Sequence, residues 1–339
     1  MKFFKISKTI YFYFLIFLSL AFISSCTKLE KSKKIDLIYD NDVDFDDLMT
    51  ILFLLKSKNI NLKAITCVGT GITHQNYGVK NVLNLLEFAN HPKIPVSYGE
   101  TESLNPHIAF PHHWAISVNN LLGIKLPKNQ NPPSPLSSVD LMIKIIKKSS
   151  RKTTILVTGP LTNLAVAITK DPSIIKNIER VFIMGGNIHS DDHLSSEQAD
   201  YNFNIDSKAV KIVFDSNLPI TLIPKETTHF APINMHILNN KKYAPKTKEC
   251  QFVMKLSKEF LKDQPNDDLY FWDAVPASII VNPKIATAYL HLPTKIMLNK
   301  YGHYVGMKIE DNNPICSVCY KINSELFYNT FFNTLNKEE

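Results

Sequence analysis

The stretch that most constrains the fold covers residues 35–55, IDLIYDNDVDFDDLMTILFLL. Its apolar run at 37–39 predicts a strand entering a buried sheet, and the run at 48–55 predicts a buried helix. Five carboxylates separate the two runs: Asp40, Asp42, Asp44, Asp46 and Asp47. Crowded carboxylates raise one another's pKa unless a positive charge lies among them. Because open α/β sheets bind ligands beyond the carboxyl ends of their strands, we expect a site here for a hard divalent cation such as Ca²⁺ or Mg²⁺.

Beyond this stretch, short apolar strands alternate with glycine-bearing turns and helices. Predicted strands cover 61–68, 92–98, 153–158, 181–184 and 220–223, and predicted helices cover 79–89, 138–148, 161–169 and 209–214. The alternation predicts an α/β fold with a central, mostly parallel sheet flanked by helices. No repeat or linker interrupts the sequence after residue 35, so we expect a single domain over 35–339. Its aromatic-rich end at 320–335 is expected to pack on the body.

The first 25 residues have the pattern of an export signal. Three lysines precede an apolar stretch at 10–22, and small residues lie just before Cys26. This order resembles the lipobox of a bacterial lipoprotein, which implies a lipid on Cys26 and a polar tether at 26–34. An ordinary signal peptide and an uncleaved anchor helix fit the same pattern. Each interpretation places the domain at the cell envelope, facing the periplasm or the exterior.

Charge and cysteine usage narrow the function further. Removing residues 1–25 takes away three lysines and no acids, which lowers the formal net charge from +7 to +4. Much of this surplus lies in the tether, so we predict no nucleic-acid binding. Cys316 and Cys319 form one CxxC pair, which fits a zinc site poorly and leaves a local disulfide or plain thiols. Cys67 lies in an apolar strand pattern and is expected in the core.

Five segments in order resemble one enzyme family. Residues 40–47 (DNDVDFDD) follow the pattern D-x-D-P-G-x-D-D, with Val43-Asp44 in place of Pro-Gly. The other matches are TGPLTN at 158–163, MGG at 184–186, ADYN at 199–202 with Asp206 after it, and FWD at 271–273. Together they resemble the inosine–uridine-preferring nucleoside hydrolases over residues 35–330, in a divergent, exported branch. The resemblance implies a Rossmann-like nucleoside hydrolase fold that hydrolyses the N-glycosidic bond of ribonucleosides to free base and ribose.

The resemblance also implies roles for particular residues. Asp42, Asp47 and Asp273 would bind Ca²⁺ through their carboxylates, and Thr158 through its main-chain carbonyl. Asp42 would also be the base that takes a proton from the attacking water. The ribonucleoside would contact Asp46, Thr70, Met184, Asp200, Asn202 and Trp272. Because family members are commonly oligomers, the resemblance also suggests a homo-oligomer.

The group that protonates the leaving base is left open by the sequence. Trp272 stands where many family members have a His, and an indole can stack on a base but cannot donate an imidazolium proton. His74, His107, His112 and His113 lie in nearby loops and are candidates. Stacking of the base without an acid is the alternative.

Several polar residues have a structural interpretation beside a functional one. Asp206 is expected to cap a helix, and Asn163 to fix the turn after Thr158. Asp40 and Asp44 support the metal ligands, contact the metal themselves or are solvated. Three residues that follow the strand at 220–223 either reach the site edge or lie on the surface: Lys225, Glu226 and His229.

Two other functions fit parts of the sequence. A non-catalytic lipoprotein that captures nucleosides would keep the pocket, and the altered loop at 43–44 with Trp272 motivates it. Residues 40–43 also resemble the D-x-D-x-[TV] motif of haloacid dehalogenase-type phosphatases. In that frame position 44 is Asp, the pair at 46–47 has no role, and no late G-D-x-x-x-D follows a strand. The hydrolase is therefore the preferred interpretation.

Overall fold

The computed structural model describes residues 33–105, 108–187 and 200–338. Residues Ile35–Glu339 form one compact unit. Cys26, His107, the predicted signal and most of the predicted tether lie outside the described residues. Among the helices that are described, none combines the length and the apolar character needed to cross a membrane.

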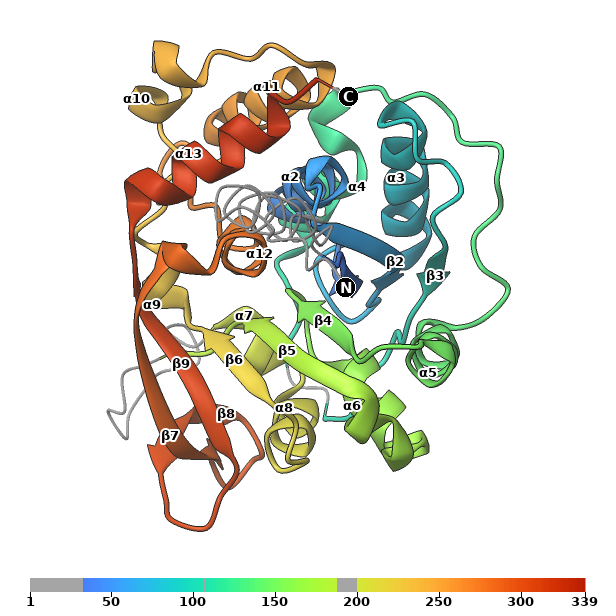
Figure 1. Ribbon diagram of the computed structural model, residues 1–339, viewed down its shortest axis with the longest axis vertical. Coiled ribbons are helices and arrows are strands. Elements are labelled where there is room, and N and C mark those ends of the chain that lie inside the picture. Colours follow the sequence, from blue (N-terminus) through green and yellow to red (C-terminus); the bar gives the residue numbers. More distant parts are fainter. Residues whose placement is uncertain (1–32, 106–107, 188–199, 339) are drawn as a thin grey trace, which may run out of the picture. The chain divides into compact units, whose positions relative to one another are not determined.

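A nine-stranded sheet runs through the unit Ile35–Glu339 in the order β3-β2-β1-β4-β5-β6-β9-β7-β8 (Figure 1). β1 to β6 are parallel to their neighbours, and β9 is parallel to β6, whereas β7 is antiparallel to both β8 and β9. The strands are β1 (Ile35–Asn41), β2 (Ile60–Cys67), β3 (Val96–Tyr98), β4 (Thr153–Val157), β5 (Ile178–Met184), β6 (Ile220–Ile223), β7 (Ala286–Leu298), β8 (Tyr304–Ile309) and β9 (Ile315–Ile322). The predicted α/β fold with a mostly parallel, Rossmann-like sheet is confirmed.

Helices cover both faces of this sheet (Figure 1). One face carries α2 (Phe45–Lys56), α3 (Gln75–Phe88), α11 (Lys248–Asp263), α12 (Ala274–Val281) and α13 (Ser324–Leu335). The other carries α5 (Ser138–Lys148), α6 (Thr162–Lys170) and α8 (Ser207–Phe214). Shorter helices are α4 (His112–Asn119), α7 (Tyr201–Ile205), α9 (Lys225–Thr228) and α10 (Met235–Leu238), and 3-10 turns cover Leu121–Gly123, Pro172–Asn177, Lys241–Tyr243 and Pro283–Ile285.

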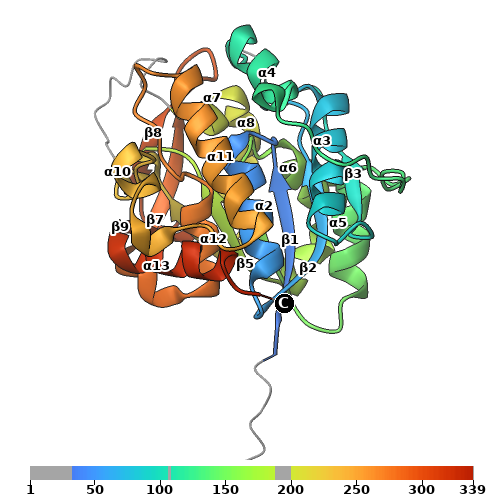
Figure 2. The ribbon, with the colours of Figure 1, turned by 90° about the horizontal axis from the view of Figure 1, so that it is seen from above.

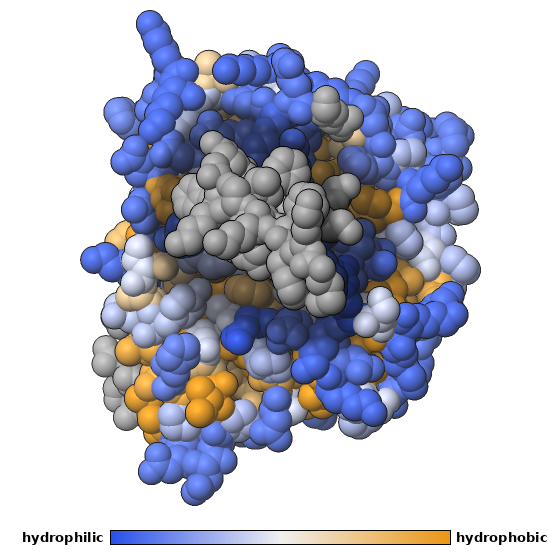
Figure 3. Space-filling view, viewed as in Figure 1, coloured by the Kyte–Doolittle hydropathy of each residue, from blue (hydrophilic) through white to orange (hydrophobic). Residues whose placement is uncertain are grey.

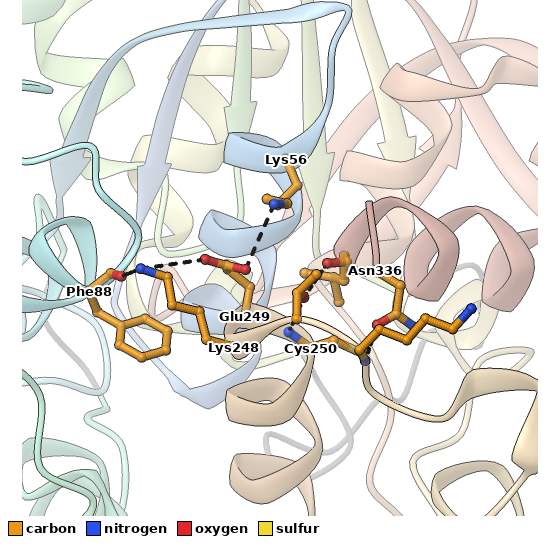
Figure 4. A network of polar contacts seen from close by, with 9 residues as sticks. Lys56, Phe88, Lys248, Glu249, Cys250 and Asn336 are labelled. Atoms are coloured by element: carbon orange, nitrogen blue, oxygen red, sulfur yellow. Dashed lines mark hydrogen bonds and ion pairs between the residues drawn. The ribbon is translucent and has the colours of Figure 1, made fainter. Parts of the chain in front are cut away.

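In the hydrophobic core on the α2 face of the sheet, helices from the C-terminal part of the chain pack against α2. Phe53 of α2 packs on Phe331 of α13 with ring centroids 5.3 Å apart, so the aromatic C-terminal segment packs on the body as expected. Figure 2 shows α11 and α12 beside α2. Near the far end of α2, the buried carboxylate of Glu249 lies 3.8 Å from Lys56 Nζ and 3.9 Å from Lys248 Nζ (Figure 4). Lys248 also donates to the carbonyl of Phe88, which joins α2, α3 and α11.

The antiparallel end of the sheet was missed by the sequence analysis, which placed no strand after residue 223. The long strand β7 is mostly half-buried or exposed, so it lacks the continuous apolar pattern of the central strands. Leu290, Ile309 and Ile315 are exposed there, and Figure 3 shows hydrophobic surface over this region. The predicted loop at 105–114 also differs, because α4 begins within it at His112.

The cysteines in the described residues are free and buried. Cys316 and Cys319 lie three positions apart on β9, so their side chains point to opposite faces of the sheet. Cys316 accordingly packs in the core beneath α6 and α8, and Cys319 in the core beneath α2 and α13. This arrangement rules out the local disulfide and the shared zinc site. Cys67 lies in the core, as predicted.

Candidate active site

A pocket of about 440 Å³ opens beyond the carboxyl ends of the parallel strands. Asp42 follows β1, Thr158 follows β4, and Met184 ends β5, and all three line it. Asp273, which precedes α12, lines the same pocket although it lies 115 residues after Thr158 in the chain. The pocket has the size of a small-molecule site and lies where a doubly wound sheet places one.

Three buried carboxylates, called the floor carboxylates below, converge at the bottom of this pocket: Asp46 and Asp273 line it, and Asp47 lies beside them without lining it. One oxygen atom from each of Asp46, Asp47 and Asp273 lies within 4.8 Å of the others. Burial raises the pKa of Asp46 and of Asp273 well above the usual range, and repulsion from neighbouring carboxylates raises both further. A desolvated, oxygen-only and mutually repelling donor set is what a hard divalent cation stabilises. The residues present therefore fit a metal ion.

Asp42 lies beside this group and is not one of its three members. Its Oδ2 accepts a hydrogen bond of 3.0 Å from the backbone N–H of Ile72. Burial, followed by the charges of Asp47 and Asp44, raises the pKa of Asp42 well above its ordinary value. A Cβ at Gly71 would lie 2.0 Å from Asp42 Cβ, so only glycine allows this close approach. Asp46, predicted to bind sugar, belongs to the close group, and Asp42, predicted as a metal ligand, contacts Asp47 of that group.

Tyr39 and Thr158 hold Asp47 from below. The Tyr39 hydroxyl donates to Asp47 Oδ1 at 2.5 Å, and the Thr158 hydroxyl lies 2.6 Å from the same oxygen. The backbone N–H of Asp44 donates to Asp47 Oδ2 at 2.9 Å. The sequence analysis counted Tyr39 only as an apolar strand residue. The available signal was its hydroxyl, which needs a polar partner when a tyrosine is buried.

Val43 and Asp44, which stand in place of Pro-Gly, each have a defined structural role in the loop before α2. Asp44 is the N-cap of α2 and forms a capping box with Asp47. Its Oδ1 also accepts from the N–H of Phe45 at 2.6 Å, and burial raises its pKa to about 7. Val43 is buried with φ at 63°, a conformation that a β-branched residue rarely adopts and that proline cannot adopt. Asp44 is therefore a helix cap that also lines the pocket.

The predicted sugar-binding residues differ in whether their side chains line the pocket and in which hydrogen bonds they already make. Asn202 lines the pocket. Its side-chain amide donates a hydrogen bond of 2.8 Å to the Thr158 carbonyl, which was predicted as a metal ligand. That carbonyl keeps a second lone pair. Asp200 also lines the pocket, but its carboxylate caps α7 through the N–H of Phe203 at 3.1 Å, and burial raises its pKa to about 6. Thr70 contacts the Thr162 hydroxyl at 3.1 Å and does not line the pocket.

Two of the structural interpretations are confirmed. Asp206 caps α8, with its Oδ1 accepting from the N–H of Ala209 at 3.0 Å. Asp40 supports the site from beneath, because its Oδ1 accepts from Thr66 at 2.7 Å and from Asn163 at 2.8 Å. Burial raises the pKa of Asp40 to about 7.

Aromatic side chains form two walls above the carboxylates. On one wall the rings of Phe110 and Tyr201 stack at 4.8 Å, and Trp114 meets Tyr201 edge-on at 5.5 Å. On the other wall Trp272 meets Tyr270 edge-on at 5.7 Å, and Tyr270 in turn stacks on a histidine ring. All six rings, the histidine included, line the pocket. Flat aromatic walls suit a planar heterocycle.

The histidine on this second wall is His229. Its ring lies 4.5 Å from that of Tyr270, with an interplanar angle of 24°. Lys225 lines the same pocket, so two of the three residues after β6 do reach the site. His74, His112 and His113, which the sequence analysis named as candidate acids, do not line it. The sequence analysis left His229 open between the site edge and the surface, because its place depends on the loop that carries Tyr270.

The strand order and the carboxylate-floored pocket define a Rossmann-like α/β protein with a metal-compatible, small-molecule site. Residues 37–329 match the family model described as inosine-uridine preferring nucleoside hydrolase, and the chain belongs to this family. The family inferred from the five motifs is thereby confirmed, and its exported branch stays a prediction.

Individual relatives agree with this assignment. The chain is 31% identical over 197 residues to the pyrimidine-specific ribonucleoside hydrolase RihA of Enterobacter sp. (strain 638), which covers 58% of this chain and 62% of that protein. The match thus spans less than two thirds of the relative. Among solved structures, the fold resembles a purine-preferring ribonucleoside hydrolase from Gardnerella vaginalis (TM-score 0.75, 22% identity, 89% of this chain and 98% of that one). It also resembles an inosine-guanosine nucleoside hydrolase (TM-score 0.78, 18% identity, 90% and 100%).

Proposed function

We propose that this protein hydrolyses the N-glycosidic bond of ribonucleosides to free base and ribose, with Ca²⁺ as its metal. The observation that carries the proposal is the convergence of Asp46, Asp47 and Asp273 at one pocket, which Asp46 and Asp273 line together with the two aromatic walls. Carboxylates at the floor suit the ribose end of a nucleoside, and the aromatic walls suit its base. Family membership supports the same reaction.

The cation would be held by Asp46, Asp47 and Asp273, with Asp42 and the Thr158 carbonyl beside them. When bound, Ca²⁺ would neutralise the carboxylates, bind ribose hydroxyls and lower the pKa of water. Several protein carboxylates around one ion suit Ca²⁺, which takes six to eight oxygen ligands, better than Mg²⁺, which usually retains water.

The chain's own residues would perform the remaining steps. Asp42 accepts the proton of the attacking water, because its carboxylate lines the pocket next to the floor. The cleavage passes through an oxocarbenium-like ribosyl group, as glycoside hydrolysis generally does. The floor carboxylates stabilise this positive charge, and their fixed positions mean that little reorganisation is required. Met184 packs on the sugar, and Asn202 fixes the Thr158 carbonyl.

The N-terminal sequence motivates a location for this activity. We propose that the chain is lipidated on Cys26, tethered by residues 26–34, and exposed at the cell envelope, where it would act in nucleoside salvage. Cys26→Ala is expected to release the protein from the membrane fraction. Unchanged membrane association of this variant would contradict lipidation.

The decisive experiment is a panel of purine and pyrimidine ribonucleosides, assayed for free base and reducing sugar with Ca²⁺ and with excess chelator. We expect cleavage with Ca²⁺ and none with chelator. Full turnover in excess chelator would contradict the metal assignment. Tight nucleoside binding without release of base over hours would instead support the capture lipoprotein.

A further inference from the structure

Protonation of the leaving base is the step for which the five family motifs of this chain provide no group. Expulsion of an unprotonated base anion is slow, so a proton donor near the base is worth a large factor in rate. Trp272, the pocket residue next to Asp273, has an indole N–H that does not ionise near neutral pH. A donor therefore has to come from elsewhere on the pocket wall.

The second aromatic wall leads from the floor to such a donor. Trp272 adjoins Asp273 in the chain, Tyr270 packs edge-on against Trp272, and His229 stacks on Tyr270. All four residues line the same pocket. His229 thus stands at the end of a continuous row of rings that starts beside the carboxylates, on the side where a base would lie.

Backbone hydrogen bonds hold His229 in this position. The N–H of Phe271 donates a hydrogen bond of 2.9 Å to the carbonyl of Ala231. The N–H of Ile233 donates one of 2.7 Å to the carbonyl of Leu269. Pro232 and Tyr270 form an isolated antiparallel bridge between these two bonds. The segment that carries His229 is therefore paired with the segment that carries Tyr270 and Trp272, so the rings keep their order.

The surroundings of His229 lower its pKa below the ordinary value of a histidine. Partial burial lowers its pKa, and Lys225 lowers it too, whereas Glu226 and Asp268 raise it. No side chain within residues 33–105, 108–187 and 200–338 forms a hydrogen bond with its ring nitrogens. A ring with this freedom can turn an N–H toward a bound heterocycle.

We propose that His229 is the acid that protonates the leaving base, a role that rests on the proposed nucleoside hydrolase function. As the bond between C1′ and the base nitrogen breaks, its electron pair moves to the base. The imidazolium of His229 gives its proton to a ring nitrogen or carbonyl oxygen of the base, which leaves neutral. Water supplies a hydroxyl to C1′ and its proton to Asp42, and solvent reprotonates His229.

The test compares substrates that need an acid with one that does not. Inosine and uridine require protonation of the base, whereas p-nitrophenyl riboside releases a stable anion. For His229→Gln we expect kcat/KM to fall about 100-fold on the nucleosides and to change less than about 3-fold on p-nitrophenyl riboside. His229→Phe keeps a ring stacked on Tyr270 and is expected to show the same split. His236→Gln, on α10 and outside the pocket, is the matched control.

The pH profile provides a second measurement. In the native enzyme, nucleoside cleavage is expected to fall as the pH rises through the pKa of His229, and this limb should be absent in His229→Gln. Equal losses on both kinds of substrate, or no loss on either, would overturn the assignment. If the native protein cleaves neither nucleosides nor p-nitrophenyl riboside, the proposed function itself fails, which is a distinguishable result.

Discussion

The hydroxyl of Tyr39 donates a 2.5 Å hydrogen bond to Asp47 Oδ1, and neither side chain is accessible to solvent. Asp47 is one of the three floor carboxylates, so Tyr39 orients a proposed metal ligand from inside the sheet. The Thr158 hydroxyl lies 3.0 Å from the Tyr39 hydroxyl and 2.6 Å from Asp47 Oδ1, so the three side chains form one buried network. The position of the metal site is therefore determined by the packing of β1 against β4 as well as by the acidic loop.

Removing the Tyr39 hydroxyl is expected to weaken metal binding without removing a ligand. For Tyr39→Phe we predict a loss of about 10-fold in Ca²⁺ affinity, because partners that orient metal ligands typically contribute 10- to 100-fold. Titration calorimetry of the metal-free protein measures this directly. Tyr243→Phe, a buried tyrosine that does not line the pocket, should bind Ca²⁺ normally. Unchanged affinity in Tyr39→Phe would exclude the orienting role.

Asp273→Asn and Asp42→Asn should separate metal binding from proton transfer. Asp273 belongs to the close group of carboxylates, so its amide variant is expected to lose both Ca²⁺ binding and activity. Asp42 lies beside the group, so Asp42→Asn is expected to keep measurable Ca²⁺ binding while kcat falls at least about 100-fold. Calorimetry together with a base-release assay distinguishes the two. Ca²⁺ affinity lost equally in both variants would make Asp42 a full ligand.

The backbone at Val43 predicts that the familiar Pro-Gly cannot simply be restored. Proline fixes φ near −65°, but Val43 has φ at 63° and donates its N–H to Asn41 Oδ1 at 3.2 Å. Val43→Pro should therefore destabilise the protein by about 3 kcal/mol or more. Asp44→Gly removes only a helix cap and should cost a few tenths of a kcal/mol. Urea unfolding measures both, and a fully stable Val43→Pro variant would show that the loop adopts another conformation.

The metal-free protein should become less stable as the pH rises. Burial raises the pKa of Asp40 and Asp44 to about 7 and that of Asp200 to about 6. The native chain therefore binds protons that the unfolded chain has lost above about pH 4. This contribution to stability is complete below that pH and disappears as the pH rises through 6 and 7.

Thermal unfolding in chelator between pH 5 and pH 8 tests this expectation. Carboxyls with lowered pKa, such as Glu310, are ionised in both states over this range and do not contribute. Ca²⁺ should raise the melting temperature most at the high end, because a cation favours the ionised carboxylates. A melting temperature that stays constant or increases with pH in chelator would be inconsistent with the buried carboxyls.

Much of the architecture could be predicted because it is local in the sequence. The apolar run at 37–39, the acidic loop and the helix after it describe one strand–turn–helix unit, and the structure contains it as β1 and α2. The alternation of further strands and helices determines a parallel sheet, since parallel strands need crossover connections. Strands with mixed exposure, such as β7, carry no such pattern and were missed.

The sequence by itself determined the fold class, the family and the end of the sheet at which the site lies, because these depend on periodicity and on motifs read in order. Only the tertiary structure decided which atoms meet. It brought Asp46 rather than Asp42 into the close group, engaged Asp200 in a helix cap, and placed Tyr39 under Asp47 and His229 beside Tyr270. Some of these contacts join residues far apart in the chain, such as His229 and Tyr270. Others depend on which of two nearby residues, Asp42 or Asp46, turns toward the group. Their distances are set by packing, which no local pattern encodes.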